Sequence, residues 1–518
     1  MPNPASPSVS GFHGLAQRVL PVNRGAVRPD GEYVLYWMTA FRRLSWNFAL
    51  DRAVWWALEL RKPLVILEAL RLDYPWASDR FHTFILQGMA ENAARCRSTP
   101  AFYYPYLERA PGEGKGLLCA LSQRACVVIT DDYPAFFLPR MTEAAGRKVD
   151  VLLEKVDANG LLPLSVPGKA FGSAYAFRRY LQSALREHLL HPPLENPLEQ
   201  LPQNPKAVSL RDIESRWPPC TEADFADPAR SVSSLPINHG VQPVTTARGG
   251  TAPARCRLED FLGRKMSRYA AERQHPDEDV TSGLSPYLHF GHIGAHEIFA
   301  AVCRHEEWSP ERLSPKATGS RQGWWGMSEG AEAFLDQLIT WRELGFNLCR
   351  YDSAYDAYDS LPAWAQNTLA KHALDPRPWL YPLPLLENAE THDPIWNAAQ
   401  RQLVQEGVIH NYLRMLWGKK ILHWTPSPQE ALEILIELNN KYALDGRDPN
   451  SYTGIFWIFG RYDRPWGPER PVFGTVRTMS SENTARKIRL EDYLARFGAE
   501  NPTIRRFSTK RRDPKGRG

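Results

Sequence analysis

Short apolar runs alternate with amphipathic segments in the first part of the chain. The runs YVLYWM, PLVILEAL and CVVITD (33–38, 63–70 and 126–131) have the length and the branched residues of buried strands. Between them, NFALDRAVWWALELR and RFHTFILQGMAENAARC repeat their apolar residues with helical period. Strands alternating with helices predict a doubly wound α/β domain built on a parallel sheet. Neither GxGxxG nor a phosphate-loop motif follows a strand, so the sheet lacks the two familiar nucleotide-binding signatures.

Helical period dominates the chain after Cys256. It predicts an all-α second domain with helices over 258–272, 331–351, 361–373, 396–406, 411–424 and 428–442. Before this part, a stretch rich in Pro, Ser, Gly and Asn has the composition of a linker. We therefore expect an N-terminal extension over 1–29, an α/β domain over 30–190, a linker over 191–255, a helical domain over 256–500 and a basic tail over 501–518.

Composition narrows the class of protein. At 518 residues the chain is longer than one hydrophobic core usually serves, and 43% hydrophobic with 23% charged residues is ordinary for a globular protein. It has no long apolar run and no signal-peptide order at its start. We therefore expect a cytoplasmic protein with no membrane partner, associated with the nucleoid if its source is prokaryotic. The seven cysteines are scattered without a CxxC, which argues against a disulfide framework and against a zinc or other metal site.

The net charge of +5 is concentrated at the C-terminus. Residues 503–518 hold seven Lys or Arg residues against one Asp. Such a run is either a solvated end or an accessory contact to nucleic-acid phosphate, and both readings stay open.

The segment NYLRMLWGKKILHW (411–424) mixes a charge with large aromatic residues. At 3.6 residues per turn, one face carries Arg414, Trp417, Ile421 and Trp424. Either this is a core helix with a snorkelling arginine, or the stripe opens onto a ligand, since arginine is rarely buried without an anionic partner. Asp445, in the polar turn after the next expected helix, is the natural partner for the arginine.

Polar residues gather at two expected helix starts. In THDPIWNAAQRQLVQEG, Thr391 and Asp393 are candidate caps of a helix that begins near the following proline. In TSGLSPYLHFGHIGAHEIFAAV (281–302), Ser285 is a candidate cap and Pro286 suits the first helical position. The second cluster is either an ordinary capped turn or a site for a phosphate or pyrophosphate.

Five motifs, in this order and spacing, carry a family resemblance. TSGLSPYLHFGHIGA, THDPIWNAAQ, LRMLWGKKILHW, LDGRDPNSYTGIFW and ERPVFGTVRTM resemble the flavin-binding domain of the class II cyclobutane pyrimidine dimer DNA photolyases, in the photolyase/cryptochrome superfamily. The stretches VLYWMTAFRRLSWNFAL and VDANGLLPLSVPGKAFGSAYAFR resemble the same family more loosely. The resemblance covers roughly residues 30 to 495.

The resemblance implies a cofactor, a substrate and a reaction. In this family a U-shaped FAD lies in the helical domain and, reduced and excited by blue light, donates an electron to a thymine dimer flipped out of the duplex. The dimer splits and the electron returns. The implied protein is a carbon–carbon lyase that repairs dimer-containing DNA, and we expect a monomer.

The resemblance also assigns roles to residues. Arg414 and Asp445 match an ion pair against the flavin, and Asn439 matches the asparagine beside flavin N5. An electron relay is matched by Trp417, Trp396 and Trp424, with the flavin at one end of the helix stripe and solvent at the other. Contacts to the FAD phosphates and adenine fall on Tyr269, Thr281, Ser282, Leu284, Ser285, Arg342 and Asp448. Contacts to the dimer fall on Gln337, Trp341, Met415 and Trp457.

The chain departs from the family at Gln337. This glutamine, four residues before Trp341, stands where the family commonly has a glutamate that hydrogen-bonds the dimer, and a glutamine does not ionise. The departure keeps open a second function, a cryptochrome-like flavin photoreceptor with weak or no repair activity. A third reading, a DNA-binding scaffold with a vestigial flavin pocket, is opposed by the intact set of Arg414, Asn439 and Asp445.

A second departure concerns the α/β domain. Ser45 and Trp46 replace the polar pair expected in the stretch that holds Arg42, Arg43, Asn47, Ala49 and Leu50. Whether the domain binds a second, antenna chromophore, a deazaflavin or other, is therefore open.

Overall fold

The computed structural model describes residues 16–203 and 207–498, and the expected basic tail lies outside them. The chain forms two compact units. Unit 1 comprises the chain up to Ser267 together with Ser282–Tyr355 and Arg447–Thr453, and unit 2 comprises Arg268–Thr281, Asp356–Gly446 and the chain from Gly454. This grouping differs from the expected boundary near residue 255, because two later segments group with the α/β part.

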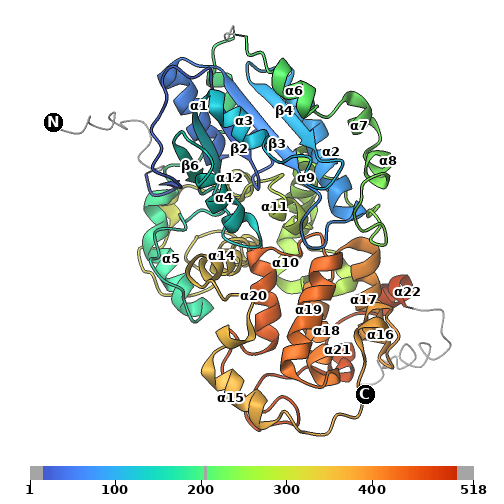
Figure 1. Ribbon diagram of the computed structural model, residues 1–518. Helices are drawn as coiled ribbons and strands as arrows, with labels where there is room; N and C mark the ends of the chain where they lie inside the picture. Colours follow the sequence, from blue (N-terminus) through green and yellow to red (C-terminus); the bar gives the residue numbers. More distant parts are fainter. Residues whose placement is uncertain (1–15, 204–206, 499–518) are drawn as a thin grey trace. The chain divides into compact units, whose positions relative to one another are not determined.

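A six-stranded sheet forms the core of unit 1 (Figure 1). Its strands are β1 (Val19–Pro21), β2 (Tyr33–Met38), β3 (Leu64–Leu70), β4 (Phe102–Leu107), β5 (Ala125–Asp131) and β6 (Leu153–Val156). The order is β1-β6-β5-β2-β3-β4, and every neighbouring pair is parallel except β1 with β6. This confirms the predicted doubly wound sheet. Part of the expected extension over 1–29 belongs to this sheet, since β1 pairs with β6 at its edge.

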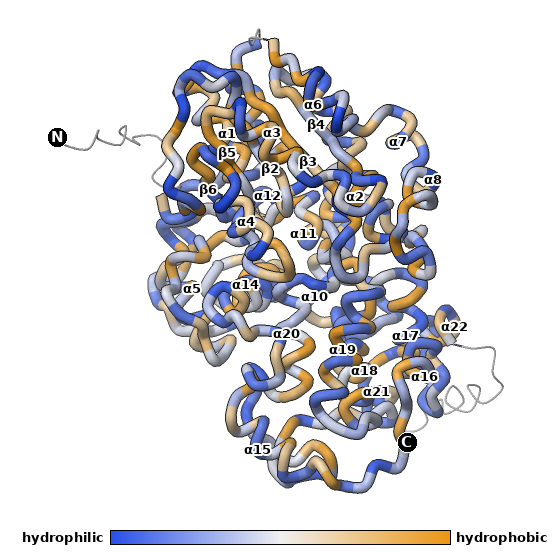
Figure 2. The backbone as a smooth tube through the Cα atoms, in the orientation of Figure 1, coloured by the Kyte–Doolittle hydropathy of each residue, from blue (hydrophilic) through white to orange (hydrophobic). Residues whose placement is uncertain are grey.

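Helices cover both faces of the sheet. On one face, Leu117 and Leu121 of α3 (Leu117–Arg124) and Ala145 of α4 (Leu138–Gly146) pack in one cluster with Leu35 and Val128. Successive right-handed crossovers place α1 (Phe48–Leu60) and α2 (Asp79–Cys96) on the other face. All residues of β2 and β5 are buried, as in a strand covered on both sides, and the apolar stretches of β3 and β5 are visible in Figure 2.

Further helices of unit 1 complete its layers. Those before the unit boundary at Ser267 are α5 (Ala174–His188), η1 (Pro197–Gln200), α6 (Arg211–Arg216), α7 (Glu222–Ala226), α8 (Pro228–Ser233), α9 (Thr251–Asp260) and η2 (Phe261–Lys265). Those after it are α11 (Ser285–His289), α12 (Ala295–His305), η4 (Pro310–Arg312), α13 (Glu329–Leu335), η5 (Asp336–Trp341) and α14 (Arg342–Tyr351). The expected linker over 191–255 thus contains short helices, which bury apolar residues such as Ile213 and Val232.

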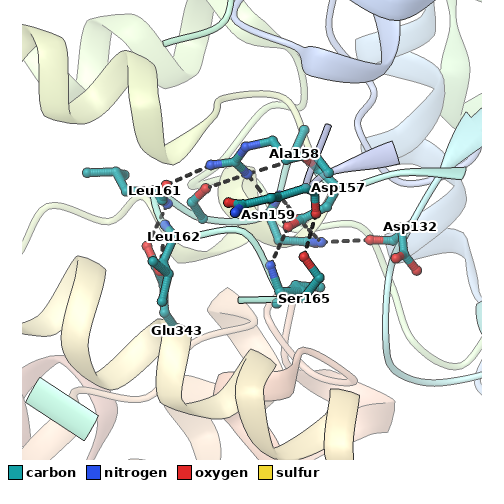
Figure 3. Close-up of polar contacts among 12 residues, drawn as sticks. Asp132, Asp157, Ala158, Asn159, Leu161, Leu162, Ser165 and Glu343 are labelled. Atoms are coloured by element: carbon teal, nitrogen blue, oxygen red, sulfur yellow. Dashed lines mark hydrogen bonds and ion pairs between the residues drawn. The ribbon is translucent and has the colours of Figure 1, made fainter. Parts of the chain in front are cut away.

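Buried polar contacts tie α14 to the segment that follows β6 (Figure 3). The Glu343 carboxylate accepts hydrogen bonds from the backbone N–H groups of Leu161 at 2.7 Å and Leu162 at 3.2 Å. In the same segment, Asn159 donates to the Asp132 carbonyl at 2.7 Å and to the Asp157 carboxylate at 2.8 Å. Burial raises the pKa of Glu343 to about 7. These contacts explain why 282–355 folds with the α/β part.

Unit 2 is helical. Its helices are η3 (Pro276–Glu278), η6 (Tyr358–Ser360), α15 (Ala363–Lys371), α16 (Leu383–Glu387), α17 (Pro394–Glu406), α18 (Asn411–Trp424), α19 (Pro428–Tyr442), α21 (Ser481–Lys487) and α22 (Glu491–Phe497). The helices α10 (Met266–Glu272) and α20 (Pro449–Ile458) cross the unit boundaries. α17, α18 and α19 pack against one another.

Three general features follow from the described residues. No helix within 16–203 and 207–498 is both long and apolar enough to cross a membrane. The same ranges hold no cluster of three or more His, Cys, Asp or Glu residues suited to a metal ion. All seven cysteines lie within these ranges as free thiols.

Candidate functional site

The residues assigned to the flavin ring lie on α18, α19 and the turn after α19, all in unit 2. Arg414 Nη2 is 3.0 Å from Asp445 Oδ1 and 3.4 Å from Oδ2, which confirms the predicted pair. The two side chains are 18% and 13% exposed, so the pair is desolvated but remains accessible to a ligand. Asn439 is buried, and its amide nitrogen donates to Asn440 Oδ1 at 3.1 Å.

The three tryptophans assigned to an electron relay lie together in the packing of α17 on α18. The indole N–H of Trp396 donates to the backbone carbonyl of Trp417 at 3.0 Å, and the rings of Trp396 and Trp424 lie 5.6 Å apart in an edge-to-face contact. Gln400 Oε1 accepts from the indole N–H of Trp417 at 3.0 Å. Gln400 comes from α17 and is fully buried. Its spacing of four residues from Trp396 on one helix face is the signal that could have identified it.

The far end of the relay differs from the prediction. Trp424 is only 1% exposed, so the expected contact of the stripe with solvent is not made by this residue. Tyr381 lies edge-to-face with the Trp424 ring at 5.4 Å and hydrogen-bonds through its hydroxyl to His392 Nδ1 at 2.7 Å. His392 is exposed and lies 5.2 Å from the Trp424 ring. Tyr381 and His392, in the segment before α17, therefore cover Trp424, which the helical pattern alone places at the surface.

Capping residues hold α17 and α18 in place. Asp393 Oδ1 accepts from the backbone N–H groups of Ile395 and Trp396, each at 3.1 Å, which confirms the predicted cap of α17. The other carboxylate oxygen of Asp393 is 3.0 Å from Lys420 Nζ on α18. The same aspartate thus orients Trp396 and fixes α18 beside it. Thr391, the second predicted cap, bonds through its hydroxyl to Asn397 Oδ1 at 2.7 Å.

The residues assigned to phosphate and adenine divide between the units. Ser282, Leu284, Ser285, Arg342 and Asp448 belong to unit 1, whereas Tyr269 and Thr281 belong to unit 2. The predicted capping role of Ser285 is wrong: this serine is the first helical residue of α11, Leu284 takes the cap position, and no side-chain cap bond forms. Instead, Ser282 Oγ accepts from the Leu284 backbone N–H at 3.4 Å.

Two of the charged residues in this set have partners within unit 1. Asp448 accepts from the Tyr133 hydroxyl at 3.1 Å and lies 3.4 Å from His289 Nδ1. Although burial opposes ionisation of the Asp448 carboxyl, its hydrogen bond with His289 and the charges of His289 and Arg342 hold its pKa below the usual value. Arg342 donates to the Asn159 carbonyl at 2.6 Å and stacks over the Phe346 ring at 4.4 Å.

The residues assigned to the dimer are half-buried. In unit 1, Gln337 and Trp341 lie in the π-helical turn η5, where the preceding Asp336 is buried and paired with Arg178 at 2.7 Å. A π-turn inside a helix often accompanies a functional site. In unit 2, Met415 lies on α18 and Trp457 in the last turn of α20. The periodicity of 331–351 gave no sign of the π-turn.

A cavity of about 560 Å³ opens in unit 1 at the carboxyl ends of the parallel strands. This is where open α/β sheets bind their ligands. Its aromatic lining includes Trp37, Tyr74, Tyr106, Phe136 and Phe137, and its cationic lining includes Arg42, Arg71, Lys115 and Lys148. The lining also includes Arg447 and the acidic Asp73 and Glu108, so its Lys and Arg residues outnumber its carboxylates. Planar walls and this excess of positive charge suit a planar, anionic aromatic molecule.

The stretch that connects β2 to α1 reaches this cavity only in part. Arg42 lines the cavity and pairs with Glu68 at 2.9 Å. Arg43, in contrast, is buried and donates to backbone carbonyls, and Asn47 caps α1. Ser45 accepts from Arg255 at 3.1 Å. The departures at Ser45 and Trp46 therefore concern internal packing, since neither residue lines the cavity.

The backbone of this stretch offers no phosphate site. The N–H groups of Thr39, Ala40 and Phe41 all donate to Asp131 Oδ2, at 2.8, 2.6 and 2.8 Å. In nucleotide-binding α/β folds such a row of N–H groups receives phosphate. Here the carboxylate at the end of β5 occupies that position.

Comparison with known proteins identifies the family. No family model matches the chain. It is 33% identical to a deoxyribodipyrimidine photo-lyase of Methanothermobacter thermautotrophicus, with 92% of this chain and 97% of the relative covered. Proteins of the same name from Potorous tridactylus and Oryza sativa are 31% and 33% identical, with 94% and 92% of this chain and 86% and 90% of the relatives covered.

A solved structure shares the fold. A crystal structure of a class III photolyase from Agrobacterium tumefaciens superimposes with a TM-score of 0.59 at 16% identity, over 90% of this chain and 86% of that chain. This likeness supports the fold, and the sequence relatives support the activity, a carbon–carbon lyase of DNA repair. The chain belongs to the deoxyribodipyrimidine photo-lyase family.

Proposed function

We propose that this protein is a class II photolyase that splits cyclobutane pyrimidine dimers in DNA under blue light, with FAD as its cofactor. The observation that carries the proposal is the set formed by Arg414, Asp445 and Asn439 on the helices that also hold the three relay tryptophans. When bound, FAD would supply the light-excited electron that opens the cyclobutane ring.

The donor set fits a flavin. The Arg414 guanidinium, already oriented by Asp445, offers a positive charge to an anionic ring, and the Asn439 amide is able to donate or accept a hydrogen bond. Trp417, Trp396 and Trp424 provide an aromatic path for the electron that reduces the cofactor. For the phosphate and adenine groups we propose Tyr269, Thr281, Ser282, Leu284, Ser285, Arg342 and Asp448.

For the flipped dimer we propose Gln337, Trp341, Met415 and Trp457. Aromatic and thioether groups stack on bases without selecting their sequence, which suits a lesion of any sequence context. The glutamine amide offers a hydrogen bond to a thymine carbonyl but no negative charge.

We further propose that the cavity of unit 1 holds an antenna chromophore, a deazaflavin or another anionic planar molecule. The aromatic walls fix the plane of such a ring, and Arg42, Arg71, Lys115 and Lys148 offset its charge.

A second candidate function is a cryptochrome-like photoreceptor. Gln337 favours it, because the family's dimer-binding carboxylate is missing. Illumination of the reduced protein with dimer-containing DNA separates the two functions. Repaired thymines, counted per absorbed photon, support the photolyase; flavin binding and photoreduction without repair support the photoreceptor. A purified protein that does not bind FAD contradicts both.

A further inference from the structure

Lys419 is a buried lysine beside Trp457, one of the residues proposed to contact the dimer. It lies on α18 and is 1% exposed. Its Nζ donates to the Ile458 carbonyl at 2.5 Å and lies 5.0 Å from the centre of the Trp457 ring. The neighbouring Gly418 permits this approach, because a Cβ there would come within 2.7 Å of the Ile458 side chain.

This position is costly for an ammonium group. Burial lowers the pKa of Lys419 to about 7, the charge of Asp463 opposes this shift, and the charge of Arg477 adds to it. The hydrogen-bond acceptor is a neutral carbonyl and the second contact is an indole face, so neither supplies a full negative charge. A methionine would fill the same space at lower cost. The presence of a lysine therefore points to a role other than stability.

The carbonyl that Lys419 binds ends α20. The last carbonyls of a helix have no partner within it and carry its partial negative charge, which a cation stabilises. The chain reverses just beyond, where Gly460 has φ of 107°. Trp457 is in this last turn, so the contact of Lys419 with Ile458 holds the backbone that carries the indole. Lys419 also lies over the indole ring, as does Arg477, whose guanidinium carbon is 5.8 Å from the ring centre.

We propose that Lys419 is a positioning residue for dimer recognition, which holds the Trp457 indole in the orientation that stacks on a flipped dimer. The proposal rests on the assignment of Trp457 to the dimer under the proposed function. It makes Lys419 act through Trp457, without contact to DNA.

The test measures dark binding of the holoenzyme to a duplex with one thymine dimer and to the same duplex without it. We expect Lys419→Met to weaken binding of the damaged duplex about tenfold and to leave undamaged binding within about twofold. Lys441→Met is the matched control, because Lys441 also pairs with a polar group, Glu387, and lies 5.4 Å from a tyrosine ring. It should bind both duplexes as the wild type does.

A double-mutant cycle separates this proposal from the proposed function. If Lys419 acts through Trp457, the double variant with Trp457→Phe should bind no worse than Trp457→Phe alone. Additive losses in the double variant would overturn the role of Lys419. So would wild-type binding by Lys419→Met if Trp457→Phe loses affinity. In both cases Trp457 would remain a residue that stacks on the dimer. Full affinity in Trp457→Phe would instead contradict the assignment of Trp457 to the dimer, and the role of Lys419 with it.

The pH profile of dimer preference gives a second, independent readout. As pH rises through about 7, Lys419 loses its charge and its attraction to the indole weakens. The preference for damaged over undamaged duplex should fall over this interval in the wild type and stay level in Lys419→Met. Parallel profiles for the two proteins would contradict the proposal.

Discussion

The rings of Trp396 and Trp424 meet edge to face, 5.6 Å apart and at 68°, although they come from different helices. Asp393 secures this contact twice, since it caps the helix of Trp396 and pairs with Lys420 on the helix of Trp424. The Trp396 indole also donates to the Trp417 carbonyl. The proposed relay thus stands on two packed helices, which hold functional groups more accurately than loops do.

Removal of the Trp417 indole should stop the proposed relay. In Trp417→Phe, blue-light reduction of bound flavin by an external reductant should slow by more than about tenfold, because a phenyl ring is far harder to oxidise than an indole. Repair by chemically reduced enzyme should stay near the wild-type rate. The exposed Trp466 of unit 2 supplies the control variant Trp466→Phe. The bleaching of flavin absorbance under light measures the rate of photoreduction in both variants. An undiminished rate in Trp417→Phe would show that electrons take another route.

Gln400 should prove necessary for the geometry of Trp417. Gln400→Met removes the acceptor of a buried indole N–H, and an unsatisfied donor costs about 1–3 kcal/mol. We expect a loss of this size in the free energy of unfolding from denaturant titration, together with slower photoreduction. Gln405→Met, on the same helix but exposed, should cost less. Equal losses in the two variants would mean that the indole bond contributes nothing specific.

Local signals predict the helices of unit 2 well. α18 and α19 have the predicted bounds, because each is periodic and ends at recognisable residues, such as Ser427, which caps α19 through the Glu430 backbone N–H. The strands β4 and β6 escaped prediction for opposite reasons. The sequence FYYPYL of β4 contains a proline, which argues against a strand, and β6 has only four residues.

Site residues defined by distant contacts are harder to predict. The pair of Arg414 and Asp445 was predictable because both residues stand in recognisable polar or mixed segments. Lys419 was not, since its role depends on Ile458 and Trp457, which follow some forty residues later. The division into units is likewise set by long-range contacts such as those of Glu343 with Leu161 and Leu162.

The antenna proposal predicts a selective loss of light harvesting. Ala69 of β3 lines the cavity, and Ala69→Phe should fill part of its 560 Å³ and prevent binding of the second chromophore. Repair under light absorbed directly by the flavin should continue, whereas the extra absorbance and its contribution to the action spectrum should disappear. Ala69→Ser, which adds one atom, is the control. Unchanged absorbance in Ala69→Phe would place the chromophore elsewhere or exclude it.

Lys419 should make the protein less stable than its methionine variant near neutral pH. The folded-state pKa of about 7 lies below the usual 10.5, so between these values the unfolded chain binds a proton that the folded chain does not. The wild-type free energy of unfolding should therefore rise with pH from about 7 to 10.5, a trend that Lys419→Met lacks. At pH 7 the variant should be more stable by on the order of 1–4 kcal/mol. Thermal unfolding across this pH range measures the difference, and a less stable variant would contradict the buried-charge argument.

The most demanding prediction concerns Gln337. Its half-buried place in the π-turn, four residues before Trp341, is where a carboxylate would meet the flipped dimer under the proposed function. Gln337→Glu should raise the repair yield per absorbed photon, because a charge-assisted hydrogen bond to the dimer is stronger than a neutral one by on the order of 1 kcal/mol. Binding of undamaged DNA should change little, since it depends on phosphate contacts outside the pocket. Gln322→Glu, at an exposed position of the same unit, controls for added charge. An unchanged yield would mean that the glutamine suffices for repair, whereas no repair from either protein with FAD bound and reduced would favour the photoreceptor.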